Sequence, residues 1–114
     1  MDLTFTTRPD RGCLIVHLDG VLDLGSVPQV RQHLEHALND GTRIFVLDLT
    51  GVRLIDSTAL GMIVWLCKEL SGDGGRVYVA GAQPLVLNVL QVTSVDSLVH
   101  ITDSVAEAEA HISA

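Results

Sequence analysis

The side chains with the clearest potential for chemistry are three adjacent oxygen-bearing ones, Asp56, Ser57 and Thr58. They follow an apolar strand and a short loop, and they stand at the start of an apolar helical segment. All three residue types suit a helix N-cap, because their oxygens accept hydrogen bonds from the free amides of the first turn. One helix start needs only one such side chain, so at least one hydroxyl should stay free near the surface. A free hydroxyl there can be phosphorylated, although helix capping alone also accounts for the three residues.

Other residues give little support for catalysis or for a bound cofactor. Ser57 has no histidine nearby in the sequence and no G-x-S-x-G motif, and the glycines form neither common phosphate-binding loop. Among five histidines only His33 and His36 share a helical face, and two imidazoles are too few for a metal site. We therefore expect a protein that is not an enzyme and that binds neither a cofactor nor a metal. The remaining histidines are His17, His100 and His111.

Length, composition and charge restrict the class of protein. A chain of 114 residues that is 47% hydrophobic and 18% charged predicts one globular domain over residues 1–114. Only four residues are aromatic (two Phe, one Trp and one Tyr), so the core should be aliphatic. A net charge of −7, with Lys68 as the single lysine, disfavours binding to nucleic acid and to anionic membranes.

The sequence also predicts a cytoplasmic location. The longest apolar run, Met62–Cys67, is far shorter than the ~18 residues of a membrane span. The segment Met1–Phe5 lacks the basic and apolar leader of a secreted protein. Cys13 and Cys67 have neither the spacing of a redox pair nor that of a zinc site, so we expect buried thiols in a reducing compartment.

Alternation of apolar and polar residues, together with turn residues, predicts the strands. The first two strands form a hairpin, and an apolar run without alternation indicates a central strand covered on both faces. Loops are expected over Val21–Leu24 and between Asp48 and Asp56. The expected strands are Leu3–Thr7, Cys13–Leu18, Ile44–Leu47, Val77–Ala80 and Leu98–Ile101, with the hairpin turn at Pro9–Gly12.

Capping residues and helical spacing predict four helices. Ser26 with Gln29, and Ser104 with Glu107, fit the capping box. The alternating order implies an α/β fold, a mixed sheet of four to five strands with about four helices packed against it. The expected helices run from Ser26 to Gly41, from Ser57 to Leu70, from Pro84 to Val92, and from Ser104 with Val105, Ala108 and Ile112 facing inward.

The second of these helices is apolar nearly all round, with Leu60, Ile63, Val64 and Cys67 on one stripe. Such a helix is either deeply buried or presents an apolar patch to a partner. Gly61 in its first turns costs about 1 kcal/mol of helix propensity relative to alanine. It therefore predicts the close approach of another backbone.

The segments Leu47-Asp48-Leu49-Thr50-Gly51-Val52 and Ile55-Asp56-Ser57-Thr58-Ala59-Leu60-Gly61 carry a resemblance to a known family. They are similar to the signature of the STAS domain family, D-L-S-x-V-x-x-[IM]-D-S-[ST]-G-L-G. The resemblance is to its single-domain anti-sigma-factor antagonists (anti-anti-sigma factors) of the sporulation and general-stress type. Leu18–Asp23 is similar to the family's L-x-G-E-L-D, and the element order agrees over essentially the whole chain. Departures are Thr50 for serine, Ala59 for glycine and Val21 for an acidic residue, and the last two put partner specificity in doubt.

The resemblance implies a phosphorylation switch in bacterial transcription. The acceptor of the family corresponds to Ser57, with Thr58 as the second choice. The unmodified protein would bind an anti-sigma factor with GHKL-type serine kinase activity and free the sigma factor, and a PP2C-type phosphatase would reset the switch. The resemblance also suggests a free monomer. The partner-binding residues that it implies are Gly20, Leu22, Asp23, Asp56, Thr58, Leu60, Gly61 and Met62.

Two other binding functions fit the same fold class less directly. A STAS scaffold subunit of a stress-sensing complex or a transporter would keep the fold but release no partner. A receiver domain would place an aspartate such as Asp48 at a central strand end. Receivers also need an acidic pair after the first strand and a lysine after a late one, whereas Asp19 stands alone and Lys68 lies mid-helix.

Overall fold

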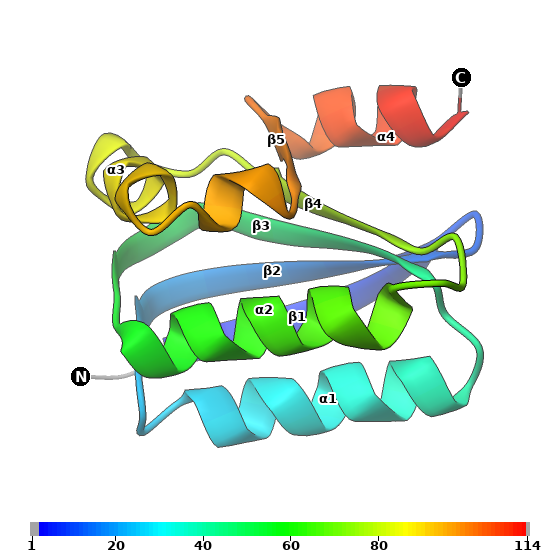
Figure 1. The fold of residues 1–114 in the computed structure, drawn as a ribbon, viewed down its shortest axis with the longest axis horizontal. Coiled ribbons are helices and arrows are strands. Elements are labelled where there is room, and N and C mark those ends of the chain that lie inside the picture. Colours follow the sequence, from blue (N-terminus) through cyan, green and yellow to red (C-terminus); the bar gives the residue numbers. More distant parts are fainter. Residues whose placement is uncertain (1–2, 114) are drawn as a thin grey trace.

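The computed structural model describes residues 3–113, which form a five-stranded mixed sheet with helices on both faces (Figure 1). The strands lie in chain order; β1 and β2 are antiparallel, and the other neighbouring pairs are parallel. The predicted α/β fold and element order are confirmed, with one added 3₁₀ turn, η1 (Val95–Ser97). The strands are β1 (Leu3–Asp10), β2 (Cys13–Leu22), β3 (Ile44–Ile55), β4 (Arg76–Ala80) and β5 (His100–Thr102), and the helices are α1 (Val27–Asn39), α2 (Ser57–Leu70), α3 (Pro84–Val92) and α4 (Val105–Ser113).

The core forms two layers, one on each face of the sheet. Helices α1 and α2 lie side by side on one face, where aliphatic side chains such as Leu34, Leu47 and Ile63 are fully buried (Figure 1). Helix α4 covers part of the other face, where Ala108 packs near Tyr78. The middle of β3 is therefore covered on both sides, as its apolar run predicts.

The β1–β2 hairpin closes more tightly than predicted. Strand β1 continues through Pro9 to Asp10, so the turn consists only of Arg11 and Gly12. Both turn residues have positive φ, 52° and 85°, as a type I′ turn requires. This turn matches the twist of the two strands and keeps them paired to their ends.

The prediction of a loop between Asp48 and Asp56 is wrong, because strand β3 continues through this segment. It continues to Ile55 beside β2, which itself continues to Leu22 through part of the second predicted loop. Two register shifts interrupt this pairing, one between His17 and Asp19 and one between Gly20 and Val21. Because such bulges bend a strand and break the alternation of side chains, the sequence pattern conceals this part of the sheet.

A polar network lies at the first bulge of β3. The Asp48 carboxylate accepts hydrogen bonds from the backbone N–H (3.1 Å) and hydroxyl (2.6 Å) of Thr50, and it lies 2.7 Å from Nδ1 of His17 on β2. Burial raises the pKa of Asp48, but the Thr50 and His17 hydrogen bonds outweigh it and leave the pKa below its ordinary value. The network therefore favours the charged carboxylate in the folded state.

Two predicted capping boxes have different outcomes. At α1 the box is wrong, because the Ser26 hydroxyl instead donates to the Val21 carbonyl and accepts from the Asp23 N–H, each at 3.0 Å. At α4 the serine half of the box is present, since Ser104 Oγ accepts from the Glu107 N–H at 3.1 Å. The Glu107 carboxylate accepts from Asp103, one residue before the position that the box requires.

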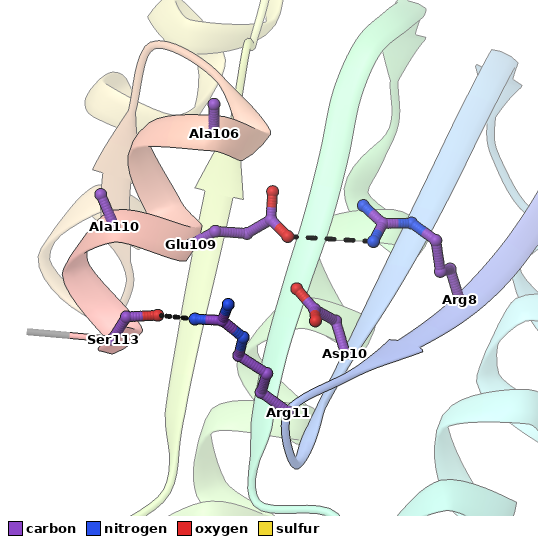
Figure 2. A pocket seen from close by; sticks show the side chains of 7 residues that line it. All are labelled: Arg8, Asp10, Arg11, Ala106, Glu109, Ala110 and Ser113. Atoms are coloured by element: carbon purple, nitrogen blue, oxygen red, sulfur yellow. Dashed lines mark hydrogen bonds and ion pairs between the residues drawn. The ribbon is translucent and has the colours of Figure 1, made fainter.

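Charged side chains connect α4 to the hairpin across a cavity of about 410 Å³ (Figure 2). Arg8 lies 3.8 Å from the Glu109 carboxylate, and Arg11 donates a hydrogen bond to the Ser113 hydroxyl at 3.0 Å. The Asp10 carboxyl raises the pKa of Glu109, mainly through a hydrogen bond between the two, while Arg8 and Arg11 lower it. The folded protein therefore holds a proton on Glu109 more readily than an isolated glutamate would.

Substitution Thr50→Val should raise the pKa of Asp48, because it removes the shortest hydrogen bond to the carboxylate. A depressed pKa stabilises the fold above the unfolded value of about 3.9, and this stability is lost as pH falls through the folded pKa. The variant should therefore be less stable than wild type at neutral pH, with a difference that shrinks on acidification. Urea unfolding across pH, together with NMR titration, measures both effects. Thr42→Val, which alters a half-buried threonine ahead of β3, is the control. A loss of stability in Thr50→Val that does not depend on pH would contradict the role given to the Thr50–Asp48 hydrogen bond.

Substitution Asp10→Asn should lower the pKa of Glu109, because it removes the neighbouring carboxyl that favours protonation. NMR titration of the Glu109 side chain measures the change. Asp103→Asn, which alters an exposed carboxylate near the start of α4, should leave that pKa unchanged. An equal shift in both variants would point to a general change in net charge instead.

Candidate functional site

Asp56 joins the start of α2 to the loop between β2 and α1. Its Oδ1 accepts the Ala59 N–H at 2.9 Å and thereby caps the helix. Its Oδ2 accepts the Leu24 N–H at 3.0 Å, and its own N–H donates to the Leu22 carbonyl at 3.2 Å. One residue therefore fixes the helix start and the neighbouring loop relative to each other.

The loop carrying Asp23 is also held by its own hydrogen bonds. The Asp23 carboxylate accepts from the Gly25 N–H at 3.0 Å, and the Asp23 carbonyl accepts from the N–H groups of Ser26 and Val27. Asp23 and Asp56 thus lie on two segments that the bond between Leu24 and Asp56 connects. The two acidic side chains add negative charge near the start of α2.

Ser57 is the first residue of α2, and its side chain is exposed. Among residues 3–113 its hydroxyl makes no hydrogen bond, because Asp56 already performs the capping that Ser57 could have supplied. Thr58, the second residue of α2, is half-buried. Of the two hydroxyls, Ser57 is therefore the more accessible to another molecule.

The predicted contact residues divide into exposed and buried groups. Asp23, Asp56, Thr58 and Leu60 are partly exposed, and Gly61 is exposed. Gly20, Leu22 and Met62 are buried instead, with Leu22 at 0% and Met62 at 2% exposure in the core. Because these last three residues are buried, they cannot form the surface of the site.

Three sequence interpretations change at this site. Within the described residues nothing lies within 4 Å of the position of a Cβ on Gly61, so no other part of the chain makes the predicted close approach. Ala59, where the family usually has glycine, is fully buried, and its methyl group packs in the core. Val21, which replaces an acidic residue, is buried as well. The two departures therefore affect the interior more than the surface.

Sequence analysis missed two exposed leucines at this end of the sheet. Leu24 is 68% exposed in the loop bonded to Asp56, and Leu54 is 49% exposed near the end of β3. Both fell in segments predicted as loops, and the signal that could have identified them is a large apolar residue in a short connection. Apolar side chains beside a free hydroxyl suit contact with a protein surface.

In the part of the chain that the structure describes, the histidines and cysteines do not assemble into a metal site. Among residues 3–113 no three His, Cys, Asp or Glu side chains are grouped to hold a metal ion. Cys13 and Cys67 are free thiols, and burial raises the pKa of both. His36 is exposed, and its Nε2 lies 3.5 Å from the carboxylate of Asp40, the C-cap residue of α1. Over the same described range, no helix combines the length and apolar character of a membrane span.

Two known proteins are similar to this chain in sequence and in fold. The anti-sigma-B factor antagonist of Staphylococcus aureus is 28% identical over 103 residues, which cover 90% of this chain and 95% of the relative. The structure of a candidate anti-sigma factor antagonist from Thermotoga maritima superposes with a TM-score of 0.91 at 27% identity, covering 96% and 95% of the two chains.

The phosphorylated form of the Bacillus cell fate determinant SpoIIAA shares the fold, with a TM-score of 0.78 at 21% identity and coverage of 96% and 99%. A model of the STAS domain matches residues 4–108. The chain therefore belongs to the STAS domain family.

Proposed function

We propose that this protein is an anti-sigma-factor antagonist whose partner binding is ended by phosphorylation of Ser57. The observation that carries the proposal is the exposed Ser57 hydroxyl, which lies beside the Asp56 cap and makes no hydrogen bond within residues 3–113. Relatives named anti-sigma-B factor antagonist support the same role. The protein would act in the cytoplasm by binding, without catalysing a reaction itself.

The proposed partner is an anti-sigma factor that is also a GHKL-type serine kinase. Its contact surface on this chain would comprise the β2–α1 loop and the start of α2. Leu24, Leu54 and Leu60 would supply apolar contact, and the open position above Gly61 would admit a partner backbone. Binding at this surface would displace the sigma factor from the kinase.

Phosphorylation would transfer the γ-phosphoryl group of ATP to Ser57 Oγ. The new O–P bond would replace the bond to ADP, and the serine proton would pass to a base on the kinase. In the free protein the added group would lie at a helix N-terminus, where the dipole and the free amides favour an anion. The modified chain therefore needs no large rearrangement.

The same phosphate would weaken the complex. It adds about −1.5 to −2 charges at pH 7. In a closed interface these charges would lie near the carboxylates of Asp23 and Asp56, and they would lose solvation as well. Release of the partner follows from repulsion and desolvation, and a PP2C-type phosphatase would restore the binding form.

Incubation with the cognate kinase and ATP should add the mass of one phosphate to wild type and to Thr58→Ala, but not to Ser57→Ala. Intact-mass measurement distinguishes the three proteins. If the Ser57→Ala variant still gains a phosphate, Ser57 is not the acceptor, and Thr58 is the next candidate. A pull-down that recovers a transporter or a stress-complex component, with no kinase, would favour the scaffold function.

The free energy of unfolding should distinguish Ser57, the proposed acceptor, from Asp56, the N-cap residue of α2. Ser57→Ala should change the free energy of unfolding by less than about 0.5 kcal/mol, because its hydroxyl has no partner within the described chain. Asp56→Ala should cost about 1–2 kcal/mol, because it removes the N-cap. Urea unfolding of both variants measures the difference. Equal losses would mean that Ser57 has a structural role as well.

A further inference from the structure

Strand β1 is an outer strand of the sheet, and no other strand of the described residues 3–113 pairs with its edge away from β2. It pairs with β2 without a register shift from Leu3 opposite Gly20 to Asp10 opposite Cys13. The strand at the other edge, β5, has only three residues. A long, regular edge strand readily accepts another strand unless charge, proline, a bulge or short length prevents it.

Protective residues are confined to the hairpin end of β1. Arg8, Pro9 and Asp10 are the charged and proline residues of the strand, whereas Leu3–Thr7 contains neither. That five-residue segment includes three threonines and one phenylalanine, which favour strands. It is therefore an unprotected pairing edge.

The hairpin turn determines which backbone groups face outward. In a two-residue hairpin the residues flanking the turn form a hydrogen-bonded pair, here Asp10 and Cys13, and such pairs alternate along the strands. The backbone groups of Arg8, Thr6 and Thr4 consequently face β2. Those at the intervening positions face the open edge, and Pro9 fits there because it has no N–H to leave unpaired. The outward N–H and C=O groups of the segment belong to Leu3, Phe5 and Thr7.

These groups make the segment complementary to itself. In an antiparallel pair with a twofold axis at Phe5, Leu3 lies opposite Thr7 of the second copy, and Phe5 lies opposite Phe5. Every outward N–H and C=O group of the segment in both copies then has a partner, and Pro9 falls outside the paired region. No side chain of Leu3–Thr7 is charged, so the net charge of −7 is not concentrated at this contact.

We propose that β1 pairs with β1 of a second copy of this chain, joining two five-stranded sheets into one. Thr4 and Thr6 would face each other across the contact on one side of the sheet. On the other side, the half-buried Phe5, whose ring contacts His33 at 5.0 Å between centroids, would lose its remaining exposure. This dimer differs from the monomer that the family resemblance suggests, and it does not depend on the proposed phosphorylation switch.

Sedimentation equilibrium over a range of protein concentration tests the dimer. Wild type should associate reversibly, and Thr7→Pro should raise the dissociation constant at least about tenfold, because each dimer loses two outward N–H donors while the pairing with β2 remains. Thr7→Lys keeps the backbone donor but places a charge on the edge, and it should weaken association as well. If Thr7→Pro does not fold, the Thr7→Lys variant still tests the proposed contact. Gln91→Lys adds the same charge on α3 and should leave the dissociation constant unchanged.

Hydrogen exchange identifies the contact. As concentration rises, the amides of Phe5 and Thr7 should become protected, while those of Thr4 and Thr6, already bonded to β2, should change little. A wild-type chain that stays monomeric up to millimolar concentration would overturn the proposal. So would a dimer that Thr7→Pro and Thr7→Lys leave intact, because its contact would lie elsewhere.

Discussion

The carboxylate of Asp56 is the contact on which the geometry of the candidate site depends. One oxygen caps α2 through Ala59, and the other holds the β2–α1 loop through Leu24. Both segments follow strands that neighbour each other in the sheet, so a single side chain closes the gap between two βα connections. Without this carboxylate, only the backbone hydrogen bond from the Asp56 N–H to the Leu22 carbonyl would still join the helix start to the end of β2.

The bulged end of the β2–β3 pair brings these segments to the same place. Each register shift bends β3, and the polar bonds among His17, Asp48 and Thr50 hold the first bend. A second contact, from the Gln83 side chain to the Thr50 carbonyl at 2.7 Å, connects the bend to the start of α3. Irregular pairing thus positions the candidate site, while the regular part of the sheet supplies the core.

Most of the fold could be predicted from local patterns, because glycine, proline and capping residues mark where its elements end. The bounds of α2 and α3 agree with the sequence prediction. Residues 48–55 could not be recognised as strand, since bulges remove the alternation that identifies one. Ser26 shows a related limit: its hydroxyl has several possible partners, and only the three-dimensional loop decides that it serves the turn and not the helix.

The candidate site was partly predictable for similar reasons. Family similarity selected Ser57, whereas local chemistry alone left it equivalent to its neighbours. The burial of Leu22 and Met62, and the exposure of Leu24 and Leu54, depend on how β3 bends and on which face of α2 meets the sheet. Such information resides in contacts between distant segments, so the spacing of residues along the chain does not contain it.

Because Asp56 caps the helix and Ser57 would carry the phosphate, the phosphorylated and unphosphorylated forms should persist for similar times. The side chain that holds the helix start is not the one that would be modified, so adding or removing a phosphate leaves the cap in place. The two forms should resist unfolding, and hence proteolysis, to a similar degree. Their ratio in a cell would then follow the relative rates of kinase and phosphatase, and the total amount of protein would stay constant while the signal changes.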